Sequence, residues 1–162
     1  MQTELLVGIC ERIYNELMNE SDPRFDVAWQ ALYRAQVRVQ SVLDLAFNDA
    51  GLPGTDVFSA LRELQKSEET SAKDLEDALL MPQYGVSRLL SRMERQGLIK
   101  RTTGKQDHRQ KVLQITAKGR SNLAAMGKTY HDVLSSFFSA RAKPGQLERM
   151  AKLLELLDSD PA

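Results

Sequence analysis

The 162-residue sequence has little of the chemistry that disulfides, metal sites and membrane spans require. Its one cysteine, Cys10, excludes an intrachain disulfide and a cysteine-rich metal site. Its two histidines, His108 and His131, show none of the usual metal-ligand spacings, so we expect no metal and no cofactor. No apolar run approaches the ~20 residues that cross a bilayer, and we therefore expect no membrane partner.

Signals for secretion and for common enzyme chemistry are also missing. The first residues include Glu4 and Glu11 and lack the basic start of a secretory signal, which favours a cytoplasmic protein. Neither a phosphate-binding GxxxxGK[ST] motif nor a GxSxG nucleophile motif occurs. The sequence therefore predicts that the chain is not an enzyme, with catalysis at an unrecognised site as the alternative.

The net charge of zero conceals two blocks of opposite sign. Residues 1–81 hold 7 basic and 15 acidic side chains, whereas residues 82–120 hold 10 basic and 2 acidic ones. Residues 121–162 are balanced, with 5 of each. A concentrated basic segment is typical of a surface that binds a polyanion, because Lys and Arg that neutralise phosphates release condensed counterions. From charge alone, a solvated basic face remains an equal alternative.

Apolar periodicity predicts a mainly α-helical chain with one small β-hairpin. The expected helices cover 4–18, 25–47, a shorter stretch from Thr55, a capped stretch from Ser71 to about Leu80, 83–96, and two stretches that follow Thr116 and Pro144. Short strands are expected at 98–101 and 111–115, on either side of a polar loop. The order of helix, turn, helix and hairpin is a winged helix-turn-helix layout.

The helix at 83–96 has two contrasting faces. Its apolar side consists of Val86, Leu89, Leu90 and Met93. The opposite side carries Tyr84, Arg88, Ser91 and Arg95. An α-helix fits the major groove of DNA, where Arg is the commonest reader of guanine. The hairpin that follows is also basic, through Lys100, Arg101, Lys105, Arg109 and Lys111. Charge on both elements favours DNA binding over a solvated surface.

Two runs of sequence resemble the MarR family of bacterial transcriptional regulators. Residues 85–101 contain the second helix of the motif, and residues 107–119 contain an Asp-x-Arg wing, an alternating strand and a Thr-x-x-Gly ending. Ile115 replaces the leucine that usually precedes that threonine, and Gly85 stands where many members have Ser or Thr. The resemblance covers roughly residues 24–157 and implies a transcriptional regulator, expected to be a repressor, that binds double-stranded DNA.

The resemblance also implies which side chains contact DNA. Base edges would be met by Gln83, Tyr84, Ser87 and Arg88, and phosphates by Ser91 and Arg92. Arg109 would enter the minor groove, where the enhanced negative potential attracts Arg, and Asp107 would hold its guanidinium in place. Arg101 and Lys105 of the basic hairpin complete the predicted DNA-binding surface.

The terminal helices have wide apolar faces, at 4–18, 123–138 and 146–157, which exceed the needs of one winged helix. By resemblance, they interlock two copies into a homodimer that reads a pseudo-palindromic operator. We therefore predict a winged helix-turn-helix domain at 51–119 and a helical dimerisation region at 1–50 and 120–162. A larger monomeric helical domain is the alternative.

Many MarR relatives are released from DNA by small aromatic acids, which implies a possible aromatic effector here. The candidate ligand-binding residues are Trp29, Tyr33, Arg34 and Phe58. Two alternatives remain open at this point. One is a thiol-based redox sensor that uses Cys10, and the other is a winged-helix interaction module whose basic face docks an acidic protein partner.

Overall fold

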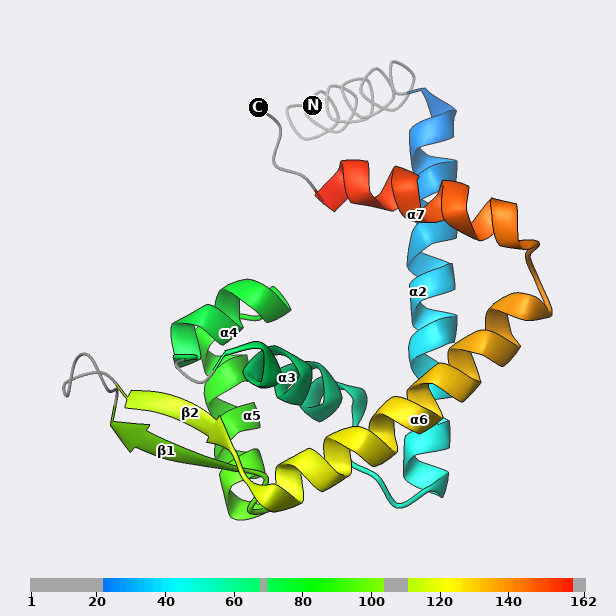
Figure 1. Cartoon of the computed structure of the whole chain (residues 1–162). Coiled ribbons are helices and arrows are strands. Elements are labelled where there is room, and N and C mark those ends of the chain that lie inside the picture. The colour runs from blue at the N-terminus through cyan, green and yellow to red at the C-terminus, as the bar shows by residue number, and fades with distance from the viewer. Residues whose placement is uncertain (1–21, 68–69, 104–110, 159–162) are drawn as a thin grey trace, which may run out of the picture. The chain divides into compact units, whose positions relative to one another are not determined.

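A computed structural model describes residues 22–67, 70–103 and 111–158 of the chain (Figure 1). The element order is α2 (Pro23–Asp49), α3 (Thr55–Lys66), α4 (Ala72–Leu79), α5 (Gln83–Arg95), β1 (Ile99–Thr103), β2 (Lys111–Ile115), α6 (Ala117–Ser139) and α7 (Pro144–Asp158). This confirms the predicted fold class, mainly helical with one antiparallel hairpin. The helix expected at 4–18 and Cys10 lie outside the described residues.

The chain divides into two compact units, residues 1–38 and 39–162. In the first unit, α2 begins with the predicted cap and proline: the Asp22 carboxylate accepts a hydrogen bond from the Arg24 backbone N–H at 3.0 Å. The Arg24 guanidinium pairs with the same carboxylate, and these hydrogen bonds lower the pKa of Asp22. All side chains of α2 from Pro23 to Arg38 are exposed, including several large apolar ones.

In the second unit, the last turns of α2 are joined to α3. Leu43 and Phe47 are buried, and Phe47 meets Phe58 of α3 edge-on, with ring centroids 5.7 Å apart. Beside them, the Thr55 hydroxyl at the start of α3 donates to the Asp44 carboxylate at 2.7 Å. This part of α2 is therefore held by both apolar and polar contacts.

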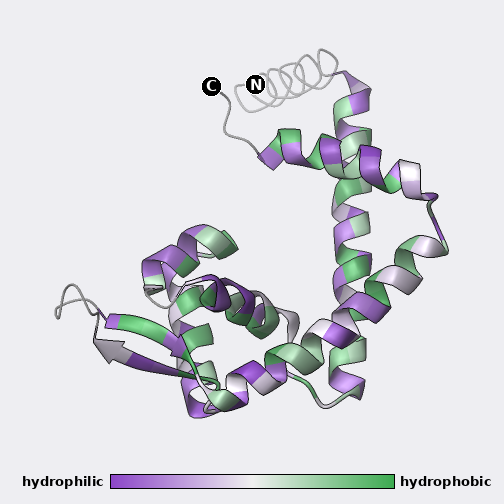
Figure 2. Cartoon of the chain, viewed as in Figure 1, coloured by the Kyte–Doolittle hydropathy of each residue, from purple (hydrophilic) through white to green (hydrophobic). Residues whose placement is uncertain are grey.

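One apolar core holds α3, α4, α5, the hairpin and the first half of α6 together. Its fully buried side chains include Leu61 of α3, Leu75 of α4, Met93 of α5, Leu113 of β2 and Met126 of α6. Burying each such side chain contributes roughly 1.5–3 kcal/mol of transfer free energy. The core thereby fixes the orientation of α5. By contrast, α7 carries apolar residues along its length (Figure 2), and most of them are exposed.

Helix α4 begins with the capping box that the sequence predicts. The Ser71 hydroxyl accepts from the Asp74 backbone N–H at 3.2 Å, and the Asp74 carboxylate accepts from the Ser71 N–H at 2.7 Å. These hydrogen bonds stabilise the ionised carboxylate and lower the pKa of Asp74. The helix ends at Leu80, whose φ of 50° is left-handed and whose side chain is 87% exposed.

The hairpin pairs β1 with β2 in antiparallel register from Ile99 opposite Ile115 to Thr103 opposite Lys111. The first strand runs two residues beyond the predicted stretch 98–101, because all five residues of β2 find a partner. A further backbone hydrogen bond of 2.9 Å joins the Leu113 N–H to the Thr70 carbonyl oxygen, which links the hairpin to the segment before α4.

The Thr-x-x-Gly sequence makes the junction between the hairpin and α6. Thr116 caps α6 by accepting from the Gly119 N–H at 3.0 Å, while its hydroxyl donates to the Gly97 carbonyl oxygen at 2.7 Å. A Cβ atom on Gly119 would overlap the Leu98 carbonyl oxygen and crowd Ile115. Glycine at this position therefore permits the close approach of α6 to the hairpin. No helix in the described part of the chain is long and apolar enough to cross a membrane.

Candidate DNA-binding surface

Helix α5 buries one face and exposes the other, as its sequence predicts. Val86, Leu89, Leu90 and Met93 are buried in the core. The four side chains that were expected at base edges are all exposed on its first two turns: Gln83, Tyr84, Ser87 and Arg88. Tyr84 is the largest of them and is 72% exposed. The core therefore presents these side chains together on one rigid element.

A shallow cavity of about 390 Å³ runs along the exposed face of α5, lined by Ser87, Arg88, Ser91, Glu94 and Arg95. Within the described ranges, neither Arg88 nor Arg95 forms an ion pair. The first turn of α5 contains no acidic residue, so the positive end of its helix dipole is not opposed there. This face combines hydroxyl and guanidinium donors, which are suited to phosphate oxygens and guanine edges.

The two residues expected at phosphates already have intramolecular partners. The Ser91 hydroxyl donates to the Ser87 carbonyl oxygen one turn earlier, at 2.9 Å. The Arg92 guanidinium pairs with the Asp56 carboxylate of α3, whose other oxygen accepts from the Val57 N–H at 2.7 Å. The side chain of Arg92 is therefore directed toward the start of α3, and a phosphate would have to compete with Asp56.

Arg101 of β1 is also held within the protein. Its Nε atom lies 3.1 Å from a carboxylate oxygen of Glu94 on α5. This pair joins the hairpin to the helix and orients the two basic elements toward each other. The other hairpin candidates, Lys105, Asp107 and Arg109, lie outside the described residues, so their roles stay predictions.

Sequence reasoning missed Asp56 and Glu94 as parts of this surface. Asp56 is 36 residues from Arg92, and no local pattern connects the two positions. Glu94 has a weak signal, since it is the only acidic side chain among the basic ones of α5. Gly85 is half-buried, and a Cβ atom there would lie 3.2 Å from the flexible end of Met81. A larger residue at position 85 would therefore require the Met81 side chain to shift, and that side chain can move.

The candidate effector residues fall in different settings. Trp29, Tyr33 and Arg34 are exposed on α2 within the first unit, where the rings of Trp29 and Tyr33 have centroids 6.3 Å apart. The Arg34 Nε donates to the Gln30 carbonyl oxygen at 3.2 Å. Phe58 belongs to the core of the second unit, where its ring centroid lies 4.8 Å from that of Tyr130. Their role in ligand binding stays a prediction.

Part of the chain is similar in sequence to a known family. Residues 50–110, which include α3, α4, α5 and β1, match the sequence model of the MarR family. Comparison with curated proteins finds no match. Among solved structures, BpsR of Bordetella bronchiseptica, described as regulated in its DNA binding by 6-hydroxynicotinic acid, has a TM-score of 0.73 at 20% identity, covering 82% of this chain and 93% of BpsR.

Two further structures share the fold. CouR of Rhodococcus jostii, solved with p-coumaroyl-CoA, has a TM-score of 0.72 at 18% identity and covers 82% of this chain and 92% of CouR. Sco3205 of Streptomyces coelicolor, a MarR family regulator solved with DNA, has a TM-score of 0.72 at 18% identity and covers 85% of this chain and 88% of Sco3205. Residues 50–110 thus match the MarR family in sequence, and the described chain shares the winged-helix fold of solved MarR-family transcription regulators.

Proposed function

We propose that this protein is a sequence-specific DNA-binding regulator, rather than an enzyme, and that it acts as a repressor. This proposal depends mainly on the exposed face of α5. The other face of this helix is buried in the core. The exposed face presents four side chains to solvent: Gln83, Tyr84, Ser87 and Arg88. A helix fixed in this way can hold its side chains in register with the base pairs of the major groove. The DNA complex of Sco3205, a protein of the same fold, supports this use.

We further propose that the protein acts as a homodimer on a pseudo-palindromic operator. Apolar side chains are exposed on α7, among them Leu153 and Leu157, and, in the other unit, Phe25 and Val27 are exposed on α2. Several large apolar side chains exposed along one helix favour a protein interface there. A two-fold dimer would place two α5 helices about 34–36 Å apart, one turn of DNA.

A small aromatic effector is the proposed control of DNA binding. Support comes from BpsR and CouR, whose structures are described with 6-hydroxynicotinic acid and p-coumaroyl-CoA. For this chain, the candidate contacts on α2 are Trp29, Tyr33 and Arg34, which are exposed. Phe58, the fourth candidate, is buried in the core of the other unit. Arg34 would supply the cation for an acidic group.

Selection from a random duplex pool, followed by affinity measurements at several salt concentrations, tests the proposal. We expect a preferred site, and a log affinity that falls linearly with log salt. Arg88→Ala should relax the sequence preference and cost about 1–3 kcal/mol, since it removes a base contact. The matched control is Lys128→Ala, an exposed cation of α6 away from this face. A wild-type chain that prefers heparin to every duplex would instead indicate an acidic protein partner.

A further inference from the structure

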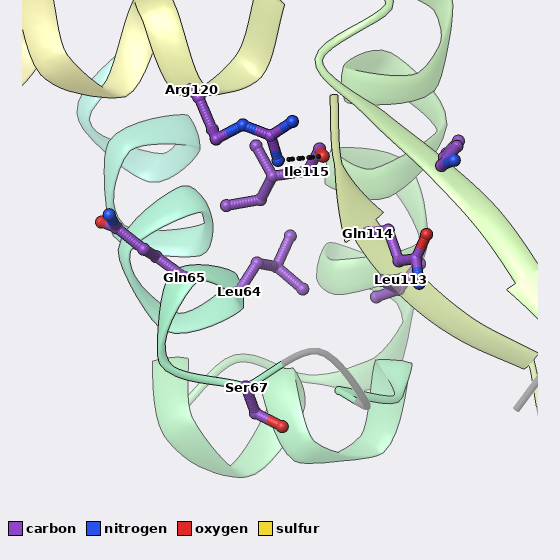
Figure 3. Close-up of a pocket in the computed structure, with 8 residues that line it drawn as sticks. Leu64, Gln65, Ser67, Leu113, Gln114, Ile115 and Arg120 are labelled. Atoms are coloured by element: carbon purple, nitrogen blue, oxygen red, sulfur yellow. Dashed lines mark hydrogen bonds between the residues drawn. The ribbon is translucent and has the colours of Figure 1, made fainter. Parts of the chain in front are cut away.

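The described parts of residues 50–119, which form the winged helix, bury or half-bury their large apolar side chains with two exceptions. In the cavity of about 360 Å³ behind the hairpin, for example, the apolar side chains that line the wall are all buried (Figure 3): Leu64, Leu113 and Ile115. Lys100 and Arg120 also line this cavity. The two exceptions are Leu80 and Tyr84, which are 87% and 72% exposed. They lie on either side of the start of α5.

Leu80 has a backbone conformation that elsewhere in the described chain is taken by glycine. Helices α2, α4 and α5 are each closed by a residue with a left-handed φ, and these residues are Gly51 (64°), Leu80 (50°) and Gly97 (70°). At all three ends, the N–H of the next residue donates to the carbonyl oxygen five residues before it, at 2.8–3.1 Å. Glycine is usual at this position, because a Cβ atom strains a left-handed residue. Leucine is therefore the less stable choice at position 80.

The turn between α4 and α5 directs Leu80 away from the core. Its neighbours Leu79 and Met81 pack against the core and line a cavity of about 300 Å³ between α3 and α4, whereas Leu80 does not line this cavity. Leu80 thus combines a strained backbone with an apolar side chain in water, and neither feature stabilises the fold. Residues of this kind concentrate at functional sites, where the strain is retained because the side chain is needed for an interaction.

The position of Leu80 favours DNA over a protein as its partner. Leu80 lies in the turn between the two helices of the motif, just before α5 begins at Gln83. In helix-turn-helix complexes, the first residues of the second helix meet the base edges. The apolar group that these edges expose in the major groove is the C5-methyl group of thymine. Two apolar side chains are too few for the core of a stable protein interface, but one can cover a methyl group.

We propose that Leu80 determines sequence specificity by contacting the C5-methyl group of a thymine in the operator, beside the bases that Tyr84 meets. This role rests on the proposed binding of DNA through α5. The contact removes both the methyl group and the leucine side chain from water, which is favourable for two apolar groups. It therefore favours thymine over the other three bases, none of which carries a methyl group, at one position in each half-site.

Deoxyuridine substitution in the selected operator tests the contact, because deoxyuridine differs from thymidine only in lacking the methyl group. Each thymine of one half-site is replaced in turn, and the affinity of the full chain is measured by fluorescence anisotropy. We expect one of these replacements to weaken wild-type binding about fourfold, the loss that corresponds to one buried methyl group. The same replacement should have almost no effect on the binding of Leu80→Gly, and a new selection with this variant should lose the preference for thymine there.

Three substitutions at position 80 separate the side chain from the backbone. Leu80→Gly adopts the left-handed φ without strain, so the turn should be kept. Leu80→Asn also tolerates this φ and has a side chain of similar shape, but it is polar and should lose the methyl effect as well. Leu80→Met retains an apolar side chain and should keep most of the effect. Lys128→Ala, which changes an exposed cation of α6, is the control and should leave the methyl effect unchanged.

The outcomes distinguish this role from the proposed function on which it rests. A wild-type chain that selects an operator, but shows no thymine at which the methyl effect depends on Leu80, would overturn the role and favour a protein partner at the turn. A wild-type chain that prefers no duplex would refute the proposed function, and the role of Leu80 with it.

Discussion

Asp56→Asn tests whether the Asp56–Arg92 ion pair limits DNA binding. The pair is partly exposed, with 44% of the Arg92 side chain and 42% of the Asp56 side chain accessible. Ion pairs of this kind contribute about 0.2–1 kcal/mol. A phosphate that takes Arg92 from Asp56 must offset this energy. Asparagine retains an oxygen that can accept from the Val57 N–H, so the start of α3 should remain intact.

We therefore expect Asp56→Asn to tighten duplex binding about 1.4- to 5-fold, the range that the ion-pair energy implies. The salt dependence should steepen by about 0.9 per protomer, because Arg92 becomes available to one more phosphate. Fluorescence anisotropy at several salt concentrations measures both quantities. Asp132→Asn on α6 is the charge-matched control, since it removes one exposed acidic side chain elsewhere.

The double variant Asp56→Asn with Arg92→Gln completes the test. If the effect acts through Arg92, then Asp56→Asn should no longer tighten binding once Arg92 is replaced. Two results would refute competition between Asp56 and a phosphate for Arg92. One is that Asp56→Asn tightens DNA binding equally with and without Arg92, and the other is that Asp132→Asn tightens it as much as Asp56→Asn. The effect would then be one of net charge.

Three further predictions concern the stability of the winged helix. Gly119→Ala should lower the free energy of unfolding by about 1–3 kcal/mol or more in urea titration, because its Cβ would overlap the Leu98 carbonyl oxygen; an unchanged midpoint would contradict that contact. Leu80→Gly should raise stability by about 1 kcal/mol, because a left-handed φ costs glycine nothing and the exposed leucine has little packing to lose; calorimetry that shows a lower melting temperature would be the opposite result. Hydrogen bonds from Ser71 lower the pKa of Asp74 in the folded protein. The ionised Asp74 carboxylate therefore contributes its full stabilisation above about pH 4, and this contribution is lost as the pH falls through the folded pKa and the carboxylate is protonated. Asp74→Asn should reduce the fall in the free energy of unfolding between about pH 4 and lower pH. An equally steep fall in this variant would show that other carboxylates are responsible for the loss of stability in acid.

Local patterns predicted most of the fold, because the signals for helices, caps and turns lie within a few residues. The two faces of α5 and the capping box at Ser71 follow from spacing alone, and the structure confirms both. The start of α6 at Thr116 is equally local.

The partners of the basic side chains could not be predicted in this way. Arg92 meets Asp56 and Arg101 meets Glu94 only after α3, α5 and the hairpin have packed together. Phe58 shows the same limit: its helical spacing is compatible with a ligand wall or a core, and only the packing with Phe47 and Tyr130 places it in the core. Tertiary contacts of this kind leave at most a weak signal in the local sequence, as at Glu94.

These contacts change what the basic block can contribute to DNA binding. Of the ten cations in residues 82–120, Arg92 and Arg101 are paired with carboxylates, and Lys100 and Arg120 line the cavity behind the hairpin. Lys118 donates to the Gln96 carbonyl oxygen at 2.8 Å. The other five cations of each protomer are Arg88 and Arg95 on the exposed face of α5, Lys111 of β2, and Lys105 and Arg109 of the predicted wing.

The proposed dimer, with ten such contacts, should show a slope of log affinity against log salt of about −9, whereas twenty engaged cations would give about −18. Measuring this slope for the selected operator distinguishes the two cases. A value close to −18 would mean that the ion pairs open on DNA and that every basic side chain of the block reaches a phosphate.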